Sequence, residues 1–253
     1  MPAPTPAPTP AETPEPAQLP LWQGYPYMFE GPARVVSVTG EGAVILDRPL
    51  FYPAGGGQPG DTGELLFEGR AIPVLDARKA DKGVALILAG GETPPEAGAA
   101  VVQRLDEARR RAHMRMHTAL HLLSVVIPLP VTGGQITAEK GRLDFDMPEA
   151  PEDKAALEAR LNALVEADHP VTDEWITDAE LEANPGLVKT MAVKPPMGSG
   201  RVRLVRIGSP EATIDLQPCG GTHVRSTGEI GPLRIGKIEK KGRQNRRVSL
   251  TFA

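Results

Sequence analysis

The chain has 253 residues, of which 40% are hydrophobic and 4% are aromatic, and its formal net charge is −4. This length and hydrophobic content suffice to bury a core and fit two modest domains. No stretch approaches the roughly 20 apolar residues that a membrane-spanning helix needs, and the N-terminal region lacks the pattern of a secretory signal. We therefore expect a soluble, cytoplasmic protein.

Residues 1–20 form the first distinct segment. Eight of the 27 prolines fall there, in Pro-Ala and Thr-Pro repeats without an apolar run. Because such a composition cannot bury enough apolar surface to fold, we expect an extended, disordered tail.

Residues 21–100 are typical of a small β domain. Short apolar runs alternate there with glycine, proline and aspartate turns, at residues 33–38, 43–47 and 83–88. A glycine-rich segment, 51–63, has the sequence FYPAGGGQPGDTG.

Residues 101–253 mix helical and strand patterns. One helix should begin near Asp106 and end before Pro128, and a second, amphipathic helix should cover 151–168. Strands are expected at 201–207, 212–216, 231–238 and 248–252. We therefore predict an α+β fold, with helices packed on a mostly antiparallel sheet.

Two pairs of metal-ligating residue types lie far apart in this second part. His117 and His121 are four residues apart, so on a helix both imidazoles lie on one face. Cys219, the only cysteine, and His223 flank two glycines in a loop that can fold back on the same ion. Because three imidazoles and one thiolate suit tetrahedral coordination, the sequence predicts a zinc site.

Other interpretations of these histidines are weaker. A metalloprotease of the His-Glu-x-x-His type carries its general base directly after the first ligand, where this chain has Thr118. His113 lies one turn before His117, but the apolar residues after His121 favour the later pair as ligands. We expect His113 on the surface or in a position that supports the ligands.

Three blocks of sequence resemble one known family. The string MHTALHLL at 116–123, the string CGGTH at 219–223 and the glycine-rich segment 51–63 are similar to the editing domain of alanyl-tRNA synthetase. They are also similar to its freestanding relatives, the AlaX-type alanyl-tRNA trans-editing proteins. The order of the blocks matches, as do the segments 228–232 and 240–247.

The resemblance implies both a fold and an activity. It implies a β-barrel-like domain at 21–100 ahead of a zinc-containing editing domain at 101–253. The implied activity is ATP-independent hydrolysis of mischarged tRNA(Ala), chiefly seryl-tRNA(Ala), with glycyl-tRNA(Ala) left open. The chain has no nucleotide-binding fingerprint such as a P-loop, so we expect no nucleotide cofactor.

Ester hydrolysis needs a positioned water, a stabilised carbonyl oxygen and a pocket for the amino acid. The backbone N–H groups of Gly220, Gly221 and Thr222 are candidates for the developing oxyanion. The hydroxyls of Thr222 and Thr118 are candidates for holding the water or the ribose.

A serine-editing site should hydrogen-bond the serine hydroxyl, which alanine lacks. The segment after the zinc helix supplies three candidates, unless they are simply turn residues: Thr132, Gln135 and Thr137. A Gly-Gly-Gln tripeptide also occurs in translation release factors, which hydrolyse peptidyl-tRNA. Its place within 51–63 instead favours a structural or substrate-approach role for Gly56, Gly57 and Gln58.

Charge is unevenly distributed along the chain. Residues 149–182 hold eleven acids and two bases, a balance of −9, whereas residues 234–247 hold seven bases and one acid, a balance of +6. Because phosphates attract a basic segment, we expect tRNA contacts from Lys240, Lys241, Arg243, Arg246 and Arg247. The alternative for each of them is a place on a solvated hairpin.

Two further function classes stay open. A threonyl-tRNA synthetase-type editing domain shares the His-x3-His spacing, but the CGGTH string and the glycine-rich domain favour the tRNA of alanine. A non-catalytic module with structural zinc would bind tRNA and leave its ester intact. The sequence does not indicate an oligomeric state.

Deleting residues 2–20 should leave the melting temperature and the deacylation rate unchanged, because a polar, proline-rich segment joins no core. Thermal denaturation of the full-length and shortened chains, followed by circular dichroism, measures the effect. A clear drop in melting temperature would show that the tail docks on the folded part.

Overall fold

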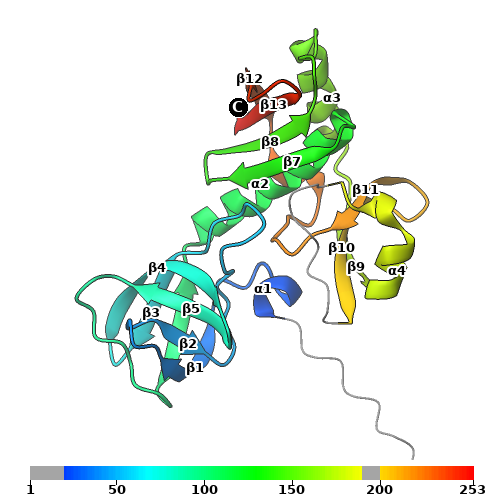
Figure 1. Cartoon of the computed structure of the whole chain (residues 1–253). Coiled ribbons are helices and arrows are strands. Elements are labelled where there is room, and N and C mark those ends of the chain that lie inside the picture. The colour runs from blue at the N-terminus through cyan, green and yellow to red at the C-terminus, as the bar shows by residue number, and fades with distance from the viewer. Residues whose placement is uncertain (1–19, 190–199) are drawn as a thin grey trace, which may run out of the picture.

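The computed structural model describes residues 20–189 and 200–253, so the expected tail lies, apart from Pro20, outside the described residues. A closed six-stranded barrel forms the first part, and two antiparallel sheets with helices form the second (Figure 1). The predicted α+β fold with a barrel-like first domain is therefore confirmed. Within the described ranges, no helix is long and apolar enough to cross a membrane.

The barrel follows a short helix, α1 (Leu21–Gly24), and its strand order is β1-β2-β5-β4-β3-β6. Apolar side chains alternate inward along the strands and fill the interior, as Ile72 and Val74 do. Because β6 closes the barrel, this unit extends to Leu105, past the boundary expected at residue 100. The strands are β1 (Glu30–Val38), β2 (Val44–Leu46), β3 (Gly63–Phe67), β4 (Arg70–Ala80), β5 (Gly83–Leu88) and β6 (Ala100–Leu105).

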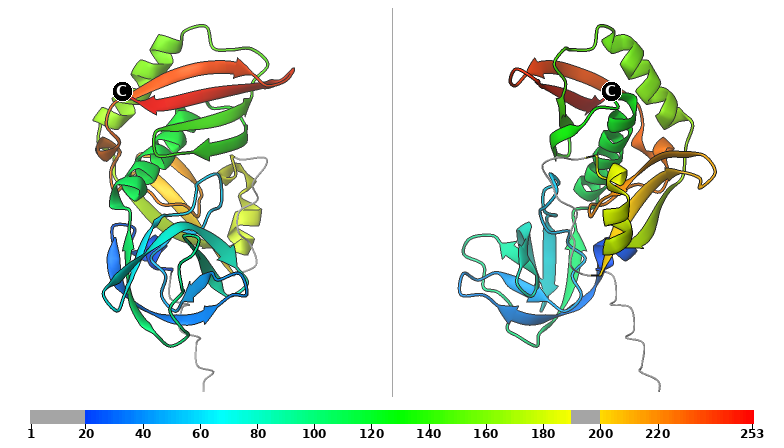
Figure 2. Two further views of the ribbon diagram at one scale, coloured as in Figure 1. Left: turned by 90° about the vertical axis from the view of Figure 1, so that its left-hand side faces the viewer. Right: turned by 45° about the vertical axis from the view of Figure 1, so that its right-hand side comes forward.

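Helix α2 (Glu107–Val126) connects the barrel to the second part and lies between them (Figure 2). Asp106 caps its first turn by accepting a hydrogen bond from the Arg109 amide at 3.0 Å. The helix ends just before Pro128, as predicted. Its second half is buried on nearly all sides, so its polar residues lie inside the molecule.

The second part contains two sheets. The four-stranded sheet has the order β12-β13-β8-β7 and shares a core with α2 and α3 (Lys154–Glu166). The three-stranded sheet has the order β11-β10-β9. Helix α4 (Asp178–Ala183) contacts β9 and β10 of this sheet. The strands are β7 (Val131–Ile136), β8 (Lys140–Asp146), β9 (Val171–Thr177), β10 (Arg201–Gly208), β11 (Thr213–Pro218), β12 (Leu233–Lys240) and β13 (Asn245–Phe252).

The four strands expected here are confirmed with small shifts of their ends, but β7, β8 and β9 were not predicted. Two glycines weaken the strand pattern of β7, and two acids beside a threonine weaken that of β9. The alternative that the candidates for serine recognition are turn residues is wrong for Thr132 and Gln135, which lie in β7. Thr137 alone lies in the turn to β8.

A buried ion pair holds the barrel on α2. The guanidinium of Arg110 bonds the Asp61 carboxylate through Nε at 3.0 and 3.1 Å and through Nη2, and the two side chains are 0% and 2% exposed. Arg110 also donates to the carbonyl oxygens of Pro26 and Leu50, at 3.0 and 2.8 Å. The Tyr52 amide donates to the same carboxylate. These bonds join α2 to the glycine-rich segment 51–63.

Replacing Arg110 by methionine should destabilise the protein by about 3–5 kcal/mol, because Asp61 then becomes a buried, unpaired charge. Urea denaturation measures the free energy of unfolding. The matched control is Arg111→Met, which breaks an exposed pair with Glu107 on the same helix and should change stability little. Equal effects of the two substitutions would contradict the role of the buried pair.

Candidate metal centre

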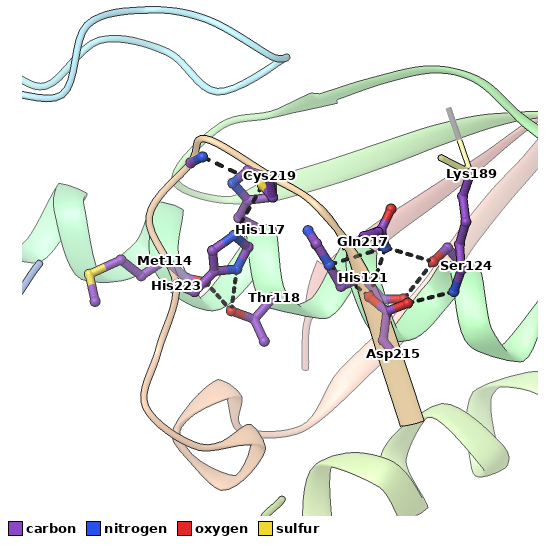
Figure 3. A network of polar contacts seen from close by, with 11 residues as sticks. Met114, His117, Thr118, His121, Ser124, Lys189, Asp215, Gln217, Cys219 and His223 are labelled. Atoms are coloured by element: carbon purple, nitrogen blue, oxygen red, sulfur yellow. Dashed lines mark hydrogen bonds and ion pairs between the residues drawn. The ribbon is translucent and has the colours of Figure 1, made fainter. Parts of the chain in front are cut away.

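The four predicted metal ligands come together in the structure and form a cluster that we call the metal group. One donor atom from each of His117, His121, Cys219 and His223 lies within 4.8 Å of all the others. Cys219 Sγ is 3.5 Å from His117 Nε2 and 3.2 Å from His223 Nε2 (Figure 3). Zinc–ligand bonds of about 2.1 to 2.3 Å at tetrahedral angles give sulfur–nitrogen separations of about 3.5 Å, so the group fits a tetrahedral cation.

Helix geometry and one glycine bring these residues together. His117 and His121 are one turn apart on α2, and Cys219 directly follows β11. A Cβ atom on Gly221 would lie only 2.1 Å from Cε1 of His117. Any other residue at 221 would therefore push the loop away from the helix, which explains the glycine between Cys219 and His223.

Each imidazole of the group is oriented through its other ring nitrogen. In all three, Nδ1 faces a side chain from a different part of the chain, which leaves Nε2 for the metal. The contacts are His117 with Gln58 Oε1 at 2.9 Å, His121 with Asp215 Oδ2 at 2.8 Å, and His223 with Thr118 Oγ1 at 3.1 Å.

The charges of the group favour a cation. Burial by itself raises the pKa of the Cys219 thiol, but the neighbouring His117 and His223 lower it well below its usual value. Burial also lowers the pKa of His121, yet hydrogen bonds to Asp215 and Cys219 outweigh this and raise it to about 9. A partly buried thiolate in such a group is stabilised by a positive charge beside it, which either a proton on His121 or a divalent cation supplies.

Three of the four candidate ligands, His117, His121 and Cys219, line one wall of a cavity of about 490 Å³. Apolar side chains such as Leu120, Ile136 and Leu143 form much of the remaining wall, together with the glycine-rich segment and α1. This size and this mixture of apolar walls with a few polar groups are typical of a site for a small organic ligand.

The two threonines expected near the chemistry are buried and support the ligands. Thr118 is fully buried, and its hydroxyl donates to the Met114 carbonyl while it faces His223. The Thr222 hydroxyl accepts a hydrogen bond from Gln58 Nε2 at 2.9 Å. Both hydroxyls are therefore engaged within the protein, and neither residue lines the cavity.

The backbone N–H groups of the loop differ in whether they already have a hydrogen-bond acceptor within the protein. The Gly221 N–H points to Cys219 Sγ at 3.4 Å, and the Thr222 N–H donates to Gln58 Oε1 at 3.1 Å. The N–H of Gly220 has no acceptor among the residues that the structure describes, and Gly220 lines the cavity. Of the three predicted oxyanion donors, Gly220 is thus the one left for a ligand.

The glycine-rich segment reaches from the barrel into the metal group. Gln58 is 2% exposed, and its amide bonds both His117 and Thr222. Gly57 has φ +85°, and a Cβ atom there would lie 2.5 Å from the Gly134 carbonyl oxygen. The glycines therefore allow the segment to pack against β7, and Gln58 holds His117, a candidate ligand, in place.

The three candidates for serine recognition differ in whether they line the cavity. Gln135 lines the cavity, whereas Thr132 and Thr137 do not. The Thr132 hydroxyl donates to the Asp144 carbonyl at 3.1 Å, and Thr137 bonds Glu139 in the exposed turn.

The predicted tRNA-binding bases lie on the β12–β13 hairpin, at the end of the molecule remote from the barrel (Figure 2). Arg247 pairs with Asp144 at 2.7 Å, and Lys241 with Glu239 at 3.4 Å. Arg246 bonds backbone carbonyls, including that of Pro148. The side chains of Lys240 and Arg243 have no hydrogen-bond or ion-pair partner within the described part of the chain, although Lys240 pairs with Arg246 in the β12–β13 ladder.

Sequence models of two families match the chain. "Threonyl and Alanyl tRNA synthetase second additional domain" matches residues 202–249, and "tRNA synthetases class II (A)" matches residues 29–109. The alanyl-tRNA editing protein AlaX-M of Methanosarcina acetivorans is 35% identical over 241 residues, which are 89% of this chain and 95% of that protein. The chain belongs to the AlaX-M family.

Other relatives agree with this assignment. The AlaX-M protein of Methanosarcina barkeri is 36% identical over 235 residues, again 89% of this chain and 95% of the relative. The alanine–tRNA ligase of Pyrobaculum neutrophilum is 38% identical over 222 residues, which are 85% of this chain but 24% of the ligase. The chain thus spans about a quarter of the ligases it matches and nearly the full length of the AlaX-M proteins.

The surface position is wrong for His113. Its side chain is fully buried, and neither ring nitrogen has a hydrogen-bond partner among the described residues, so it supports no ligand through a hydrogen bond. Burial, with a contribution from the charge of Arg109, lowers its pKa to about 4, so the ring is neutral. Charged groups of two distant segments lie near it, Asp61 of the glycine-rich segment and Glu139 of the β7–β8 turn.

Several residues of the site were missed by the sequence reasoning. Asp215 and Gln217 precede Cys219 at intervals of two, which on a strand places all three on one face. That alternation was a usable signal. Lys189, which pairs with Asp215, gives no such signal, because only the tertiary structure brings it to the cavity.

The purified protein should contain about one divalent cation per chain, and Cys219→Ala should lose it, because the thiolate is the only charged ligand.

Asp215→Asn should lower metal affinity about 10- to 100-fold, because it weakens the hydrogen bond that orients His121. Elemental analysis and competition with a chelating dye measure both. Thr132→Val, which lies outside the group, serves as control, and a metal-free wild-type protein prepared without chelator would contradict the assignment.

Proposed function

We propose that this protein is a trans-editing hydrolase that removes the amino acid from mischarged tRNA(Ala), chiefly seryl-tRNA(Ala), at a zinc site formed by His117, His121, Cys219 and His223. The observation that carries the proposal is that this group opens onto a cavity of about 490 Å³ in a chain of the AlaX-M family. The reaction needs no ATP and takes place in the cytoplasm.

The donor set favours zinc over other cations. Three neutral imidazoles and one thiolate in a tetrahedral arrangement are typical of Zn²⁺, whereas Mg²⁺ and Ca²⁺ prefer oxygen ligands. When bound, zinc supplies Lewis-acid chemistry that polarises an ester or orients a water.

The chain's own residues supply the remaining functions. The free N–H of Gly220 is placed to donate to the carbonyl oxygen of the ester as it becomes negative. Gln58, Thr118 and Thr222 hold the ligands and the loop rigid through the hydrogen bonds described above. Gln135 and the backbone of Gly56 and Gly57 form walls against which the aminoacyl-ribose end of the tRNA packs.

The decisive experiment compares hydrolysis of seryl-tRNA(Ala) and alanyl-tRNA(Ala) by the purified, metal-loaded protein. We expect the seryl ester to be cleaved at least about tenfold faster, since a site that binds the serine hydroxyl is left with an unpaired polar group by alanine. Equal rates would make the protein a general deacylase. Binding without cleavage would make it a non-catalytic tRNA-binding module, and a preference for seryl-tRNA(Thr) would make it a threonyl-type editor.

The basic hairpin should bind tRNA phosphates. Replacing Lys240, Lys241 and Arg243 together by alanine should weaken tRNA binding and reduce its salt dependence by about one unit of log–log slope per lost phosphate contact. Filter binding between low and moderate salt measures this, with metal content as a check on folding. The matched control removes three exposed bases of the barrel, Arg48, Arg70 and Lys82; if it has the same effect, the RNA surface lies elsewhere.

A further inference from the structure

Gln217 is a buried polar side chain on the wall of the cavity. It lies two residues before Cys219 on β11, so both side chains face the same cavity. Only 7% of Gln217 is exposed, although its amide carries two donors and an acceptor that each need a partner.

The Asp215 carboxylate fixes the direction of this amide. Asp215 Oδ2 is 2.7 Å from Gln217 Nε2 and 2.8 Å from His121 Nδ1, and Lys189 pairs with the other carboxylate oxygen (Figure 3). Because a carboxylate accepts hydrogen bonds and donates none, the NH2 group of Gln217 faces Asp215 and its carbonyl oxygen faces away.

That carbonyl oxygen is left for a ligand. Within residues 20–189 and 200–253, the contacts of the Gln217 amide all run through Nε2, to Asp215, Ser124 and His121. Figure 3 shows the Gln217 side-chain oxygen directed away from Asp215, with no dashed line to any residue drawn there. The cavity thus contains a hydrogen-bond acceptor that is both preoriented and almost removed from solvent, close to the metal group.

Gln135 differs from Gln217 in the property that decides selectivity. Gln135 is exposed, and its Oε1 already accepts a hydrogen bond from Arg142 at 3.1 Å. If a ligand offers it no donor, Arg142 and water still satisfy it. Strong discrimination requires instead a buried polar group that the wrong ligand leaves unpaired, and Gln217 has that property.

We propose that Gln217 Oε1 accepts a hydrogen bond from the side-chain hydroxyl of a serine esterified to tRNA, and that this contact sets the preference for seryl over alanyl esters. The inference rests on the proposed function and names the residue behind its selectivity. Alanine places a methyl group against this oxygen and leaves it unpaired. Glycine offers no donor either, so glycyl-tRNA(Ala) belongs with the poor substrates.

The neighbouring charge argues for the hydroxyl over the α-ammonium group as the donor. Lys189 lies on the same wall and pairs with the carboxylate that holds the Gln217 amide. A second positive charge beside it is disfavoured, whereas a neutral hydroxyl is not.

The test compares Gln217→Met with Gln135→Met, which remove the same amide from two positions in one cavity. Methionine keeps nearly the same length and volume. In Gln217→Met we expect the ratio of kcat/KM for seryl-tRNA(Ala) to that for alanyl-tRNA(Ala) to fall about tenfold or more, through loss on the seryl ester. In Gln135→Met both rates should fall in parallel. Metal content must match that of the wild type, because Gln217 also contacts Asp215.

A binding measurement keeps the test valid if a substitution disturbs catalysis. Calorimetry with the non-hydrolysable 3′-serylamino and 3′-alanylamino derivatives of 3′-deoxyadenosine should show a preference for the seryl compound that Gln217→Met removes. A ratio unchanged in Gln217→Met, or one that collapses in Gln135→Met instead, would overturn the assignment. If the wild type does not cleave seryl-tRNA(Ala), the proposed function itself fails, which is a different outcome.

Discussion

The buried ion pair between Arg110 and Asp61 is the constraint on which the rest of the site depends. An isolated charge in this position is strongly unfavourable, so the barrel and α2 are held in the one arrangement that pairs both groups. Asp61 lies three residues after Gln58, and this short stretch of chain carries the same constraint to the metal group. The position of the barrel is thereby coupled to the orientation of His117.

The metal group shows how orientation is distributed over the fold. Its three imidazoles are each held through Nδ1 by a different segment: the glycine-rich segment, β11 and α2 itself. A substitution of one of these Nδ1 partners therefore changes the orientation of an imidazole, although the substituted residue is not itself a candidate ligand. The close approach of Gly221 to His117 adds a steric constraint, since the loop reaches the helix only where a side chain is absent.

The polar side chains around the cavity differ in how far they are buried and in whether other protein groups already satisfy them. The hydroxyls of Thr118 and Thr222 are satisfied inside the protein and serve the ligands. Gln135 stays in contact with water and Arg142, so it contributes contacts without a strong penalty for a wrong ligand. Gln217 combines burial with an acceptor that has no partner among the described residues, and such a group disfavours any ligand that brings no matching donor.

The sequence by itself determined the local features. The His-x3-His spacing, the CGGTH loop, the caps of α2 and four strands of the second part follow from periodicity and residue chemistry, which act over a few residues. The sequence did not determine β7 and β9, because glycines and acids blur their alternation, and pairing with β8 and β10 stabilises them in the fold.

Only the tertiary structure decided what lies next to the ligands. Gln58, Asp215 and Lys189 are remote from His117 and His121 in the chain, and no local pattern encodes their contacts. The burial of His113 is likewise a property of the folded chain, in which Asp61 and Glu139 come near it from distant segments. The physical reason is the same in each case: burial and hydrogen-bond partners are properties of packed surfaces, and separate segments create those surfaces only when they meet.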